Sequence, residues 1–319
     1  MNILLTGSIA YDYLMSFPGY FKDHFLPGQL ESISLSFLVD SMVRRRGGVA
    51  PNIAYTLALL GEKPKIMATV GEDFEEYRTW LEDKGVDTGF IRTINGEYTA
   101  SFFANTDQSN AQIASFYTGA MAYASELSLA EIPAGTIDLV VISPNDPKAM
   151  DKTVKECQTL GIPYLYDPSQ QLARIGQQEI LDGVSKADSL FVNDYEFGLL
   201  QKHTGLSAEH LLSSIRIVVV TEGEKGASIH VGGEKFHINS IQPKTIADPT
   251  GVGDAFRGGF LKGYSLGFDW QTCGQMGALA ATYCLEQKGT QSHSYTRQEF
   301  VNRYRENFDD HGLLDVLIK

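Results

Sequence analysis

The chain has 319 residues, 43 % of them hydrophobic and 20 % charged, which is typical of a globular enzyme with one or two domains. Its formal charge of −13 argues against a nucleic-acid or acidic-membrane partner, because such partners are usually bound through basic patches. Three scattered cysteines, no signal-peptide pattern after Met1 and no apolar run of about 18 residues predict a cytoplasmic protein with reduced thiols.

Short apolar or β-branched runs alternate with helical patterns along most of the chain. The runs predict buried strands over Ile3–Thr6, Lys65–Val70, Asp138–Ile142, Pro163–Tyr166, Ser189–Val192 and Ile215–Thr221. The patterns between them predict helices over Asn52–Leu60, Phe74–Lys84, Pro147–Leu160 and Asp194–Lys202. This alternation indicates an α/β fold with a mostly parallel central sheet and helices on both faces.

Two stretches interrupt this alternation with patterns typical of exposed strands. The alternating segments within them are Ser32–Val39, Thr99–Asn105 and Ala111–Tyr117. We predict a small β-sheet lid inserted in two segments, residues 13–43 and 88–119. Residues 1–12, 44–87 and 120–319 would then form the α/β domain that binds the ligands. Two unrelated surface hairpins are the alternative.

The only dense basic run is Arg44–Arg46, beside the first of these stretches. Three charges make a weak signal for anion binding, so we expect them in a solvated loop.

The stretch Asp248–Asp254 reads DPTGVGD and leads into a helix of small residues. Gly251 and Gly253 allow a tight turn that brings the backbone close to a ligand. The free N–H groups of the helix start would bind an anion such as phosphate. Asp254 lies in the first turn, where it would act as a general base that deprotonates a hydroxyl. The alternative is a carboxylate that only stabilises the helix dipole.

Neither of the two common nucleotide-binding loops is present. A Walker A loop needs a Gly-Lys pair, which the chain lacks, and a dinucleotide fingerprint needs glycine where Phe256 stands. Upstream, Asn193 and Glu196 lie three residues apart where a predicted strand gives way to a helix. Their oxygens would suit Mg²⁺, which usually keeps several waters, although a simple capping box has the same spacing.

Another predicted strand ends at Thr221 and runs into a turn that contains Gly223 and Gly226. This turn would suit a nucleotide, although an ordinary β-turn looks similar.

Together these motifs resemble the ribokinase-like (PfkB) family of carbohydrate and nucleoside kinases, over essentially the whole chain. The family signature Asp-Thr-x-Gly-x-Gly-Asp matches Asp248–Asp254, except that Pro249-Thr250 replaces the common Thr-x. A Gly-Gly pair followed by Asn matches Gly47–Asn52, and an early substrate aspartate matches Asp12. The longer strings TGSIAYDYLMSFPG, AQIASFYTGAM and DPSQQLARI are most similar to bacterial adenosine kinases of mycobacterial type.

The resemblance implies an adenosine kinase that transfers the terminal phosphate of ATP to the 5′-hydroxyl in purine salvage. A kinase for another nucleoside or a sugar is the alternative. Asp254 would be the base, with backbone N–H groups of Gly251, Val252 and Gly253 at the phosphoryl oxygens. The implied nucleoside contacts are Ser8, Asp12, Ser36, Gly48, Asn52, Phe102, Phe116, Gln170, Gln171 and Arg174. Phe102 and Phe116 would stack on the purine; packing as core aromatics is their alternative role.

The resemblance also implies cofactor contacts and an assembly. ATP would be bound by Asn193, Thr221, Gly223 and Gly226, and Mg²⁺ by Glu196 through water. Backbone carbonyls near Asp248 and Gly289 would bind K⁺. Lid sheets in this family pair between subunits, so a homodimer through the lid is expected.

Overall fold

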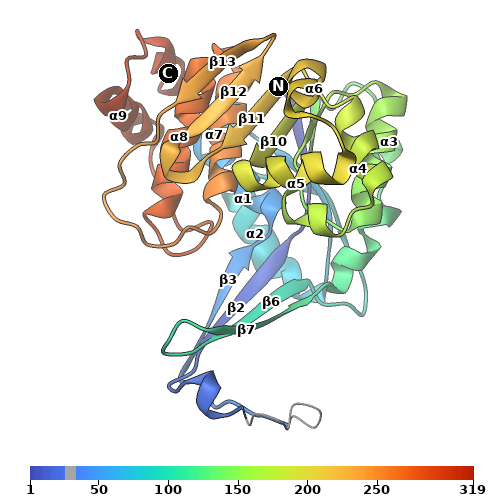
Figure 1. The fold of residues 1–319 in the computed structure, drawn as a ribbon, viewed down its shortest axis with the longest axis vertical. Coiled ribbons are helices and arrows are strands. Elements are labelled where there is room, and N and C mark those ends of the chain that lie inside the picture. The colour runs from blue at the N-terminus through green and yellow to red at the C-terminus, as the bar shows by residue number, and fades with distance from the viewer. Residues whose placement is uncertain (26–33) are drawn as a thin grey trace.

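The computed structural model describes residues 1–25 and 34–319. A large sheet has helices on both faces, and a smaller sheet projects from it (Figure 1). The strand order in the large sheet is β13-β12-β11-β10-β9-β8-β1-β4-β5. The strands are β1 (Ile3–Thr6), β4 (Lys65–Val70), β5 (Asp87–Thr93), β8 (Leu139–Ile142), β9 (Tyr164–Tyr166), β10 (Ser189–Asn193), β11 (Ile217–Thr221), β12 (Ala227–Val231) and β13 (Glu234–Ile238).

Strand pairs from β5 to β11 are parallel, whereas β12 and β13 are antiparallel. Each of the six predicted strands is present, with small shifts at the ends, and the mostly parallel sheet is confirmed. The hairpin of β12 and β13 was not predicted, although Gly232-Gly233 between two alternating runs is a hairpin signal.

Alternate residues of each central strand point into separate hydrophobic layers. Leu5 and Val141 belong to the core beneath α1 (Val49–Leu59), α2 (Glu75–Asp83), α7 (Val252–Ser265) and α8 (Trp270–Leu285). Leu4 and Val140 belong to the core beneath α3 (Pro147–Leu160), α4 (Gln177–Ser185), α5 (Asp194–Thr204) and α6 (Ala208–Ser214). This two-sided burial explains why the central strands read as continuous apolar runs, and it confirms helices on both faces.

The smaller sheet has the order β3-β2-β6-β7, which confirms a second sheet over two unrelated hairpins. Its strands are β2 (Ala10–Ser16), β3 (Ser41–Gly47), β6 (Ala100–Thr106) and β7 (Gln112–Tyr117). Two details of the predicted lid are wrong. Residues 34–39 are not a strand, while 32 and 33 lie outside the described residues. β5, placed in the lid by the sequence, pairs with β4 in the large sheet.

The basic run Arg44–Arg46 lies on β3 and not in a loop, so that prediction is also wrong. The reason is that the arginine side chains cover aromatic rings. The Arg44 guanidinium lies 4.7 Å from the ring centre of Tyr11, and that of Arg46 lies 4.6 Å from the ring centre of Trp80.

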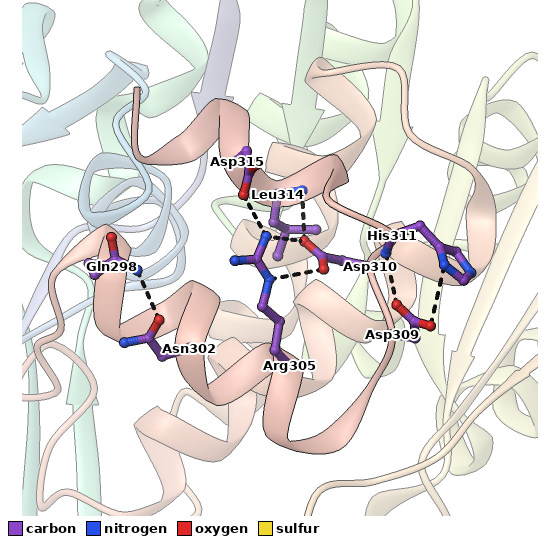
Figure 2. A network of polar contacts seen from close by, with 8 residues as sticks. All are labelled: Gln298, Asn302, Arg305, Asp309, Asp310, His311, Leu314 and Asp315. Carbon is purple, nitrogen blue, oxygen red and sulfur yellow. Dashed lines mark hydrogen bonds and ion pairs between the residues drawn. The ribbon is translucent and has the colours of Figure 1, made fainter.

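Ion pairs of one arginine connect the C-terminal segment to α9 (Arg297–Asn307) (Figure 2). Arg305 donates to both carboxylate oxygens of Asp310 (3.0 and 2.9 Å) and to Asp315 (2.6 Å). Asp310 also accepts the backbone N–H of Leu314 (3.0 Å). These contacts hold the short 3₁₀ helix Leu313–Leu317 against α9.

Within the described ranges, no helix combines the length and apolarity needed to cross a lipid bilayer. Cys157, Cys273 and Cys284 are buried free thiols.

Candidate active site

Polar residues gather where the parallel strands of the large sheet end. Asp167 follows β9, Asn193 ends β10 and Thr221 ends β11, while Ser8 follows β1. Asn193 and Thr221 are register partners in adjacent strands, so they lie side by side. The carboxyl ends of parallel strands are where α/β proteins place their ligands.

Asp254 lies in the first turn of α7, which begins after Gly251. Gly251 has a φ of +76°, and a Cβ there would lie 2.8 Å from the side chain of Thr290. Both observations require glycine. Among the described residues no side chain caps this helix start. The Val252 N–H makes only a long contact to the Pro249 carbonyl (3.5 Å), so the N–H groups remain available to an anion.

The Asp254 carboxylate accepts a hydrogen bond from Asn52 Nδ2 (2.8 Å). Burial raises the pKa of Asp254 to about 6, while Arg257 and the Asn52 hydrogen bond oppose that shift and Glu196 adds to it. A carboxylate with a pKa near neutrality suits a general base, because it is ionised at neutral pH yet accepts a proton readily.

A buried chain of polar groups orients Asn52. Gln291 Nε2 donates to Asn52 Oδ1 (2.7 Å) and to Tyr77 Oη (2.5 Å), and Tyr77 donates to the Gly47 carbonyl (3.1 Å). With Oδ1 engaged by Gln291, the Asn52 amide must present Nδ2 to Asp254. The sequence missed Gln291 and Tyr77, since neither lies in a motif and Gln291 is 239 positions from Asn52.

A row of four side chains crosses one face of the small sheet. The strand registers pair Arg45 with Asp12, Asp12 with Phe102 and Phe102 with Phe116. Phe116 is 46 % exposed, so it is not a core aromatic. A carboxylate and two aromatic rings therefore share a face of this sheet.

Arg45 connects this row to the start of the DPTGVGD stretch. Its Nη1 lies 3.2 Å from Asp248 Oδ2, which also accepts the Gly289 N–H (3.1 Å). Burial raises the pKa of Asp12 to about 6, with Arg45 lowering it and Asp248 raising it. The Asp12 carboxylate is therefore partly desolvated, which strengthens its interaction with a hydroxyl donor.

Gly48 joins β3 to α1 at a position where only glycine fits. Its φ is +99°, and a Cβ would lie 2.4 Å from the Ser8 carbonyl oxygen. Ser8 Oγ accepts the N–H of Val49 (3.4 Å). At Gly47, a Cβ would lie 2.7 Å from Asp12 Oδ2. The structure thus brings Ser8, Asp12 and Gly48 together at the base of the small sheet.

Asn193 and Glu196 form the capping box that was the alternative interpretation of their spacing. Each side chain accepts the backbone N–H of the other residue, at 2.7 and 2.9 Å. Glu196 Oε1 also accepts from Ser169 Oγ (3.2 Å). Among the described residues, no three His, Cys, Asp or Glu side chains form a metal-binding group. A single carboxylate already engaged in hydrogen bonds fits a contact to Mg²⁺ through water better than direct coordination.

Thr221, Gly223 and Gly226 form the turn after β11, with a positive φ at both glycines. A Cβ at Gly226 would lie 1.9 Å from the Ile238 carbonyl oxygen, so the turn packs closely on β13.

The segment after β9 holds the predicted Gln170, Gln171 and Arg174. Gln171 is buried and donates to the Asn145 carbonyl (2.7 Å), whereas Gln170 and Arg174 are exposed. Ser36 is not brought to the other site residues among those the structure describes. It is exposed and precedes Phe37, which packs on Phe17 and Phe21 beyond the Ser16 end of β2. Its role in binding stays a prediction.

A second pair missed by the sequence lies beneath Asp254. Arg257, one turn along α7, forms a buried ion pair with Asp167 (Nε to Oδ2, 2.5 Å). The signal in the sequence was an arginine three residues after the expected base, but its partner is 90 positions away.

Comparison with known proteins identifies the family. The model of the pfkB family carbohydrate kinases matches residues 23–297. A nucleoside kinase of Methanothermobacter thermautotrophicus is 30 % identical over 95 % of both chains. The nucleoside kinase of Burkholderia thailandensis, solved with inosine, has a TM-score of 0.84 and 34 % identity over 96 % of this chain and 98 % of that one.

A second structure of that Burkholderia enzyme, with ADP-inosine, has a TM-score of 0.83 and 36 % identity over 96 % of each chain. The matches span nearly the whole chain and agree with the large parallel sheet and the smaller projecting sheet. The chain therefore belongs to the pfkB family of carbohydrate kinases and is a phosphotransferase with the ribokinase-like α/β fold.

Proposed function

We propose that this kinase phosphorylates the 5′-hydroxyl of adenosine with ATP, giving AMP and ADP, a reaction of purine salvage. The observation that carries the proposal is the row on the small sheet, where Asp12 lies beside Phe102 and Phe116. A carboxylate binds the vicinal ribose hydroxyls, and two rings bind the faces of a base. A bare sugar has no base to stack. The neighbouring Burkholderia structures support the nucleoside class, because they contain inosine.

In this proposal Asp254 takes the proton of the 5′-hydroxyl as its oxygen forms a bond to the γ-phosphorus. The bond from that phosphorus to the bridging oxygen breaks, and ADP leaves with the electron pair. The backbone N–H groups at Gly251, Val252 and Gly253 stabilise the charge on the transferring oxygens. Mg²⁺, when bound, supplies charge neutralisation at the phosphates. Asn193, Thr221, Gly223 and Gly226 would hold the nucleotide, and Glu196 the water shell of the metal.

The small sheet would act as the lid of this site. Its strand β2 carries Asp12, and the adjacent strands β6 and β7 carry the aromatic pair, so closing it over the nucleoside excludes water from the phosphoryl group. Exclusion of water favours the ribose hydroxyl as acceptor over hydrolysis of ATP.

The second candidate is another purine nucleoside, because the Burkholderia neighbour was solved with inosine. Adenosine and inosine share the ribose and the stacking surface, so neither Asp12 nor the aromatic pair separates them. A coupled ADP-release assay over adenosine, inosine, guanosine, cytidine, ribose and fructose decides between them. Preference for adenosine in kcat/KM supports the proposal; preference for ribose or fructose refutes the nucleoside assignment.

The catalytic assignment is tested by Asp254→Asn. This change keeps the size of the side chain and its contact with Asn52 but removes the base, so turnover should be abolished while calorimetry still detects nucleoside binding. The matched control is Asp309→Asn, an exposed aspartate near the C-terminus (Figure 2). Retained turnover in Asp254→Asn removes this residue from the mechanism.

A homodimer through the lid is part of the proposal. β3 and β7 are the edges of the small sheet, and exposed apolar side chains lie on both, including Met42 (61 % exposed) and Ile113 (42 % exposed). Unpaired strand edges with apolar side chains favour pairing with a second copy. Light scattering after gel filtration should give twice the chain mass, and Met42→Lys should shift it toward the monomer.

The K⁺ response remains a prediction about the loop near Asp248 and Gly289. In the structure Arg45 already places a cation on Asp248, and a Cβ at Gly289 would lie 3.2 Å from Arg45 Cδ. The ADP-release assay with K⁺ exchanged for tetramethylammonium at constant ionic strength measures whether a monovalent cation contributes.

A further inference from the structure

Arg257 and Asp167 form a buried pair at the phosphoryl end of the site. Arg257 is 7 % exposed and Asp167 is fully buried directly after β9. Two of the three guanidinium nitrogens face the carboxylate, with Nε 2.5 Å from Oδ2 and Nη2 donating to Oδ1 (2.7 Å). The Nε contact is an ion pair and not a well-aligned hydrogen bond. This side-on arrangement fixes the plane of the guanidinium group.

The third nitrogen, Nη1, faces the turn that begins α7. It lies 2.8 Å from where a Cβ on Gly253 would stand, and no hydrogen-bond partner for it is found among the described residues. Its place is therefore beside the first turn of α7, level with Gly253 and the following Asp254. Glycine at 253 leaves room for this group.

Burying a charged arginine in this way lowers the stability of the fold, so its retention suggests that the charge has a function. Burying a guanidinium requires a carboxylate partner, and a well-packed apolar pair would often stabilise the fold as well or better. The carboxylates of Asp167, Asp254 and Glu196 all favour the charged guanidinium, and among the described residues only Asp167 pairs with it directly. The side chain thus brings a fixed positive charge, with one free donor edge, to a helix start already suited to an anion.

We propose that Arg257 is a further catalytic residue, whose Nη1 donates to an oxygen of the transferring phosphoryl group, and that Asp167 is the positioning residue that aims it. The proposal rests on the phosphotransfer chemistry assigned above to the Asp254 site. As the γ-phosphorus moves from ADP to the acceptor hydroxyl, negative charge spreads over its equatorial oxygens. Arg257 stabilises that charge from the side, while the N–H groups of the α7 start stabilise it along the helix axis. No bond to Arg257 forms or breaks, and Asp254 alone takes the proton.

The test compares Arg257→Lys and Arg257→Gln with Arg216→Lys. Arg216 is a matched control: it makes the same side-on pair with Asp188 (both contacts 2.7 Å), but at the amino ends of β10 and β11, away from the site. The acceptor is whichever compound of the substrate panel the wild-type enzyme uses best, so failure of the adenosine assignment leaves this test intact. For each variant, calorimetry measures binding of ADP with Mg²⁺ and of the acceptor, and kinetics measure kcat and the inhibition by ADP with aluminium fluoride.

Loss of a donor that acts in the transition state should lower kcat about 10²- to 10³-fold. Binding of the acceptor and of ADP should change less than about threefold, while inhibition by ADP with aluminium fluoride weakens in parallel with kcat. Asp167→Asn keeps Arg257 but removes the charged partner that fixes the orientation of its guanidinium, so it should lower kcat by a smaller factor at unchanged acceptor KM. Arg216→Lys should match the wild type.

Three results would overturn the proposal. The first is a kcat of Arg257→Lys within about threefold of wild type. The second is full recovery of kcat in Arg257→Gln at high pH, which would mean that Arg257 acts only by keeping Asp254 ionised. The third is equal weakening of ADP and of the aluminium fluoride complex, which would mean a role in ground-state binding. If Arg257→Gln does not fold, the lysine and Asp167→Asn variants decide.

Discussion

Replacing Gln291 by leucine should change the pH dependence of the enzyme through Asn52, without removing any residue predicted to contact the substrate. Leucine keeps about the same volume but removes the donor that fixes the Asn52 amide (2.7 Å). Asn52 is then free to rotate, and its hydrogen bond to Asp254 (2.8 Å) weakens. That bond stabilises the ionised carboxylate, so its loss raises the pKa of Asp254 above its value of about 6.

The size of the change follows from the contacts. A hydrogen bond to a charged group contributes about 1.5–3 kcal/mol, and one pKa unit corresponds to about 1.4 kcal/mol, so the pKa of Asp254 should rise by about 1–2 units. Asn52 Oδ1 is also left without its partner inside the protein, which should lower the free energy of unfolding by about 1–3 kcal/mol. The acid limb of kcat/KM should therefore move from about pH 6 into the range of about pH 7–8.

The measurement is kcat/KM for the best nucleoside from about pH 5 to about pH 9, with urea denaturation alongside. Gln298→Leu is the control, because Gln298 is exposed on α9 and its side chain donates to Asn302 (2.8 Å), away from the site (Figure 2). Activity of Gln291→Leu should approach that of the control at the alkaline end and fall below it as the pH is lowered. Superimposable pH profiles for the two variants would refute the role of Gln291 in setting the state of Asp254.

Three further predictions concern binding, backbone conformation and stability. Phe102→Ala should raise the nucleoside KM about 5- to 150-fold, from a stacking contribution of about 1–3 kcal/mol, with the KM for ATP unchanged; an unchanged nucleoside KM would contradict purine stacking. Gly48→Ala should lower the melting temperature markedly and abolish activity, because a Cβ would lie 2.4 Å from the Ser8 carbonyl at a φ of +99°, and wild-type melting would contradict this. Arg305→Leu should lower the free energy of unfolding only slightly at neutral pH, since solvent screens the exposed Arg305 side chain. Arg305 lowers the pKa of Asp310 to about 2, so this difference should be present above about pH 4 and vanish as the pH falls toward 2; a pH-independent difference in urea denaturation would argue against the pair.

The sequence predicted those parts of the protein whose signals are local. The apolar runs of β1, β4 and β8 are buried on both faces, and the helix start at Gly251 carries its glycine and its acid within a few residues. Gly48 was singled out by the Gly-Gly pair of the family signature, whereas its positive φ is a finding of the structure.

What the sequence missed depends on contacts between distant segments. Gln291 and Tyr77 become part of the site only when the loop after α8 packs on α1. The role of Arg257 can be inferred only once its pairing with Asp167 is known. The small sheet was predicted, but its strands β2 and β3 were not, because the sequence placed one alternating segment at Ser32–Val39 instead. An alternating pattern does not determine strand register. The arginines of β3 were expected in a solvated loop because the sequence does not show that they cover Tyr11 and Trp80.

The position of β1 has a consequence for how the chain folds during synthesis. This strand lies between β4 and β8, so Ile3 pairs with Leu139, and Asn52 finds its partners only at Asp254 and Gln291. During synthesis β1 can pair on both sides only after residue 142 has been made, and the Asn52 side chain must wait for residues 254 and 291. A chain that ends before residue 254 would lack both partners of the Asn52 side chain. We therefore expect nascent chains of this kinase to need protection until release, and C-terminal truncations to aggregate rather than to yield a weak enzyme.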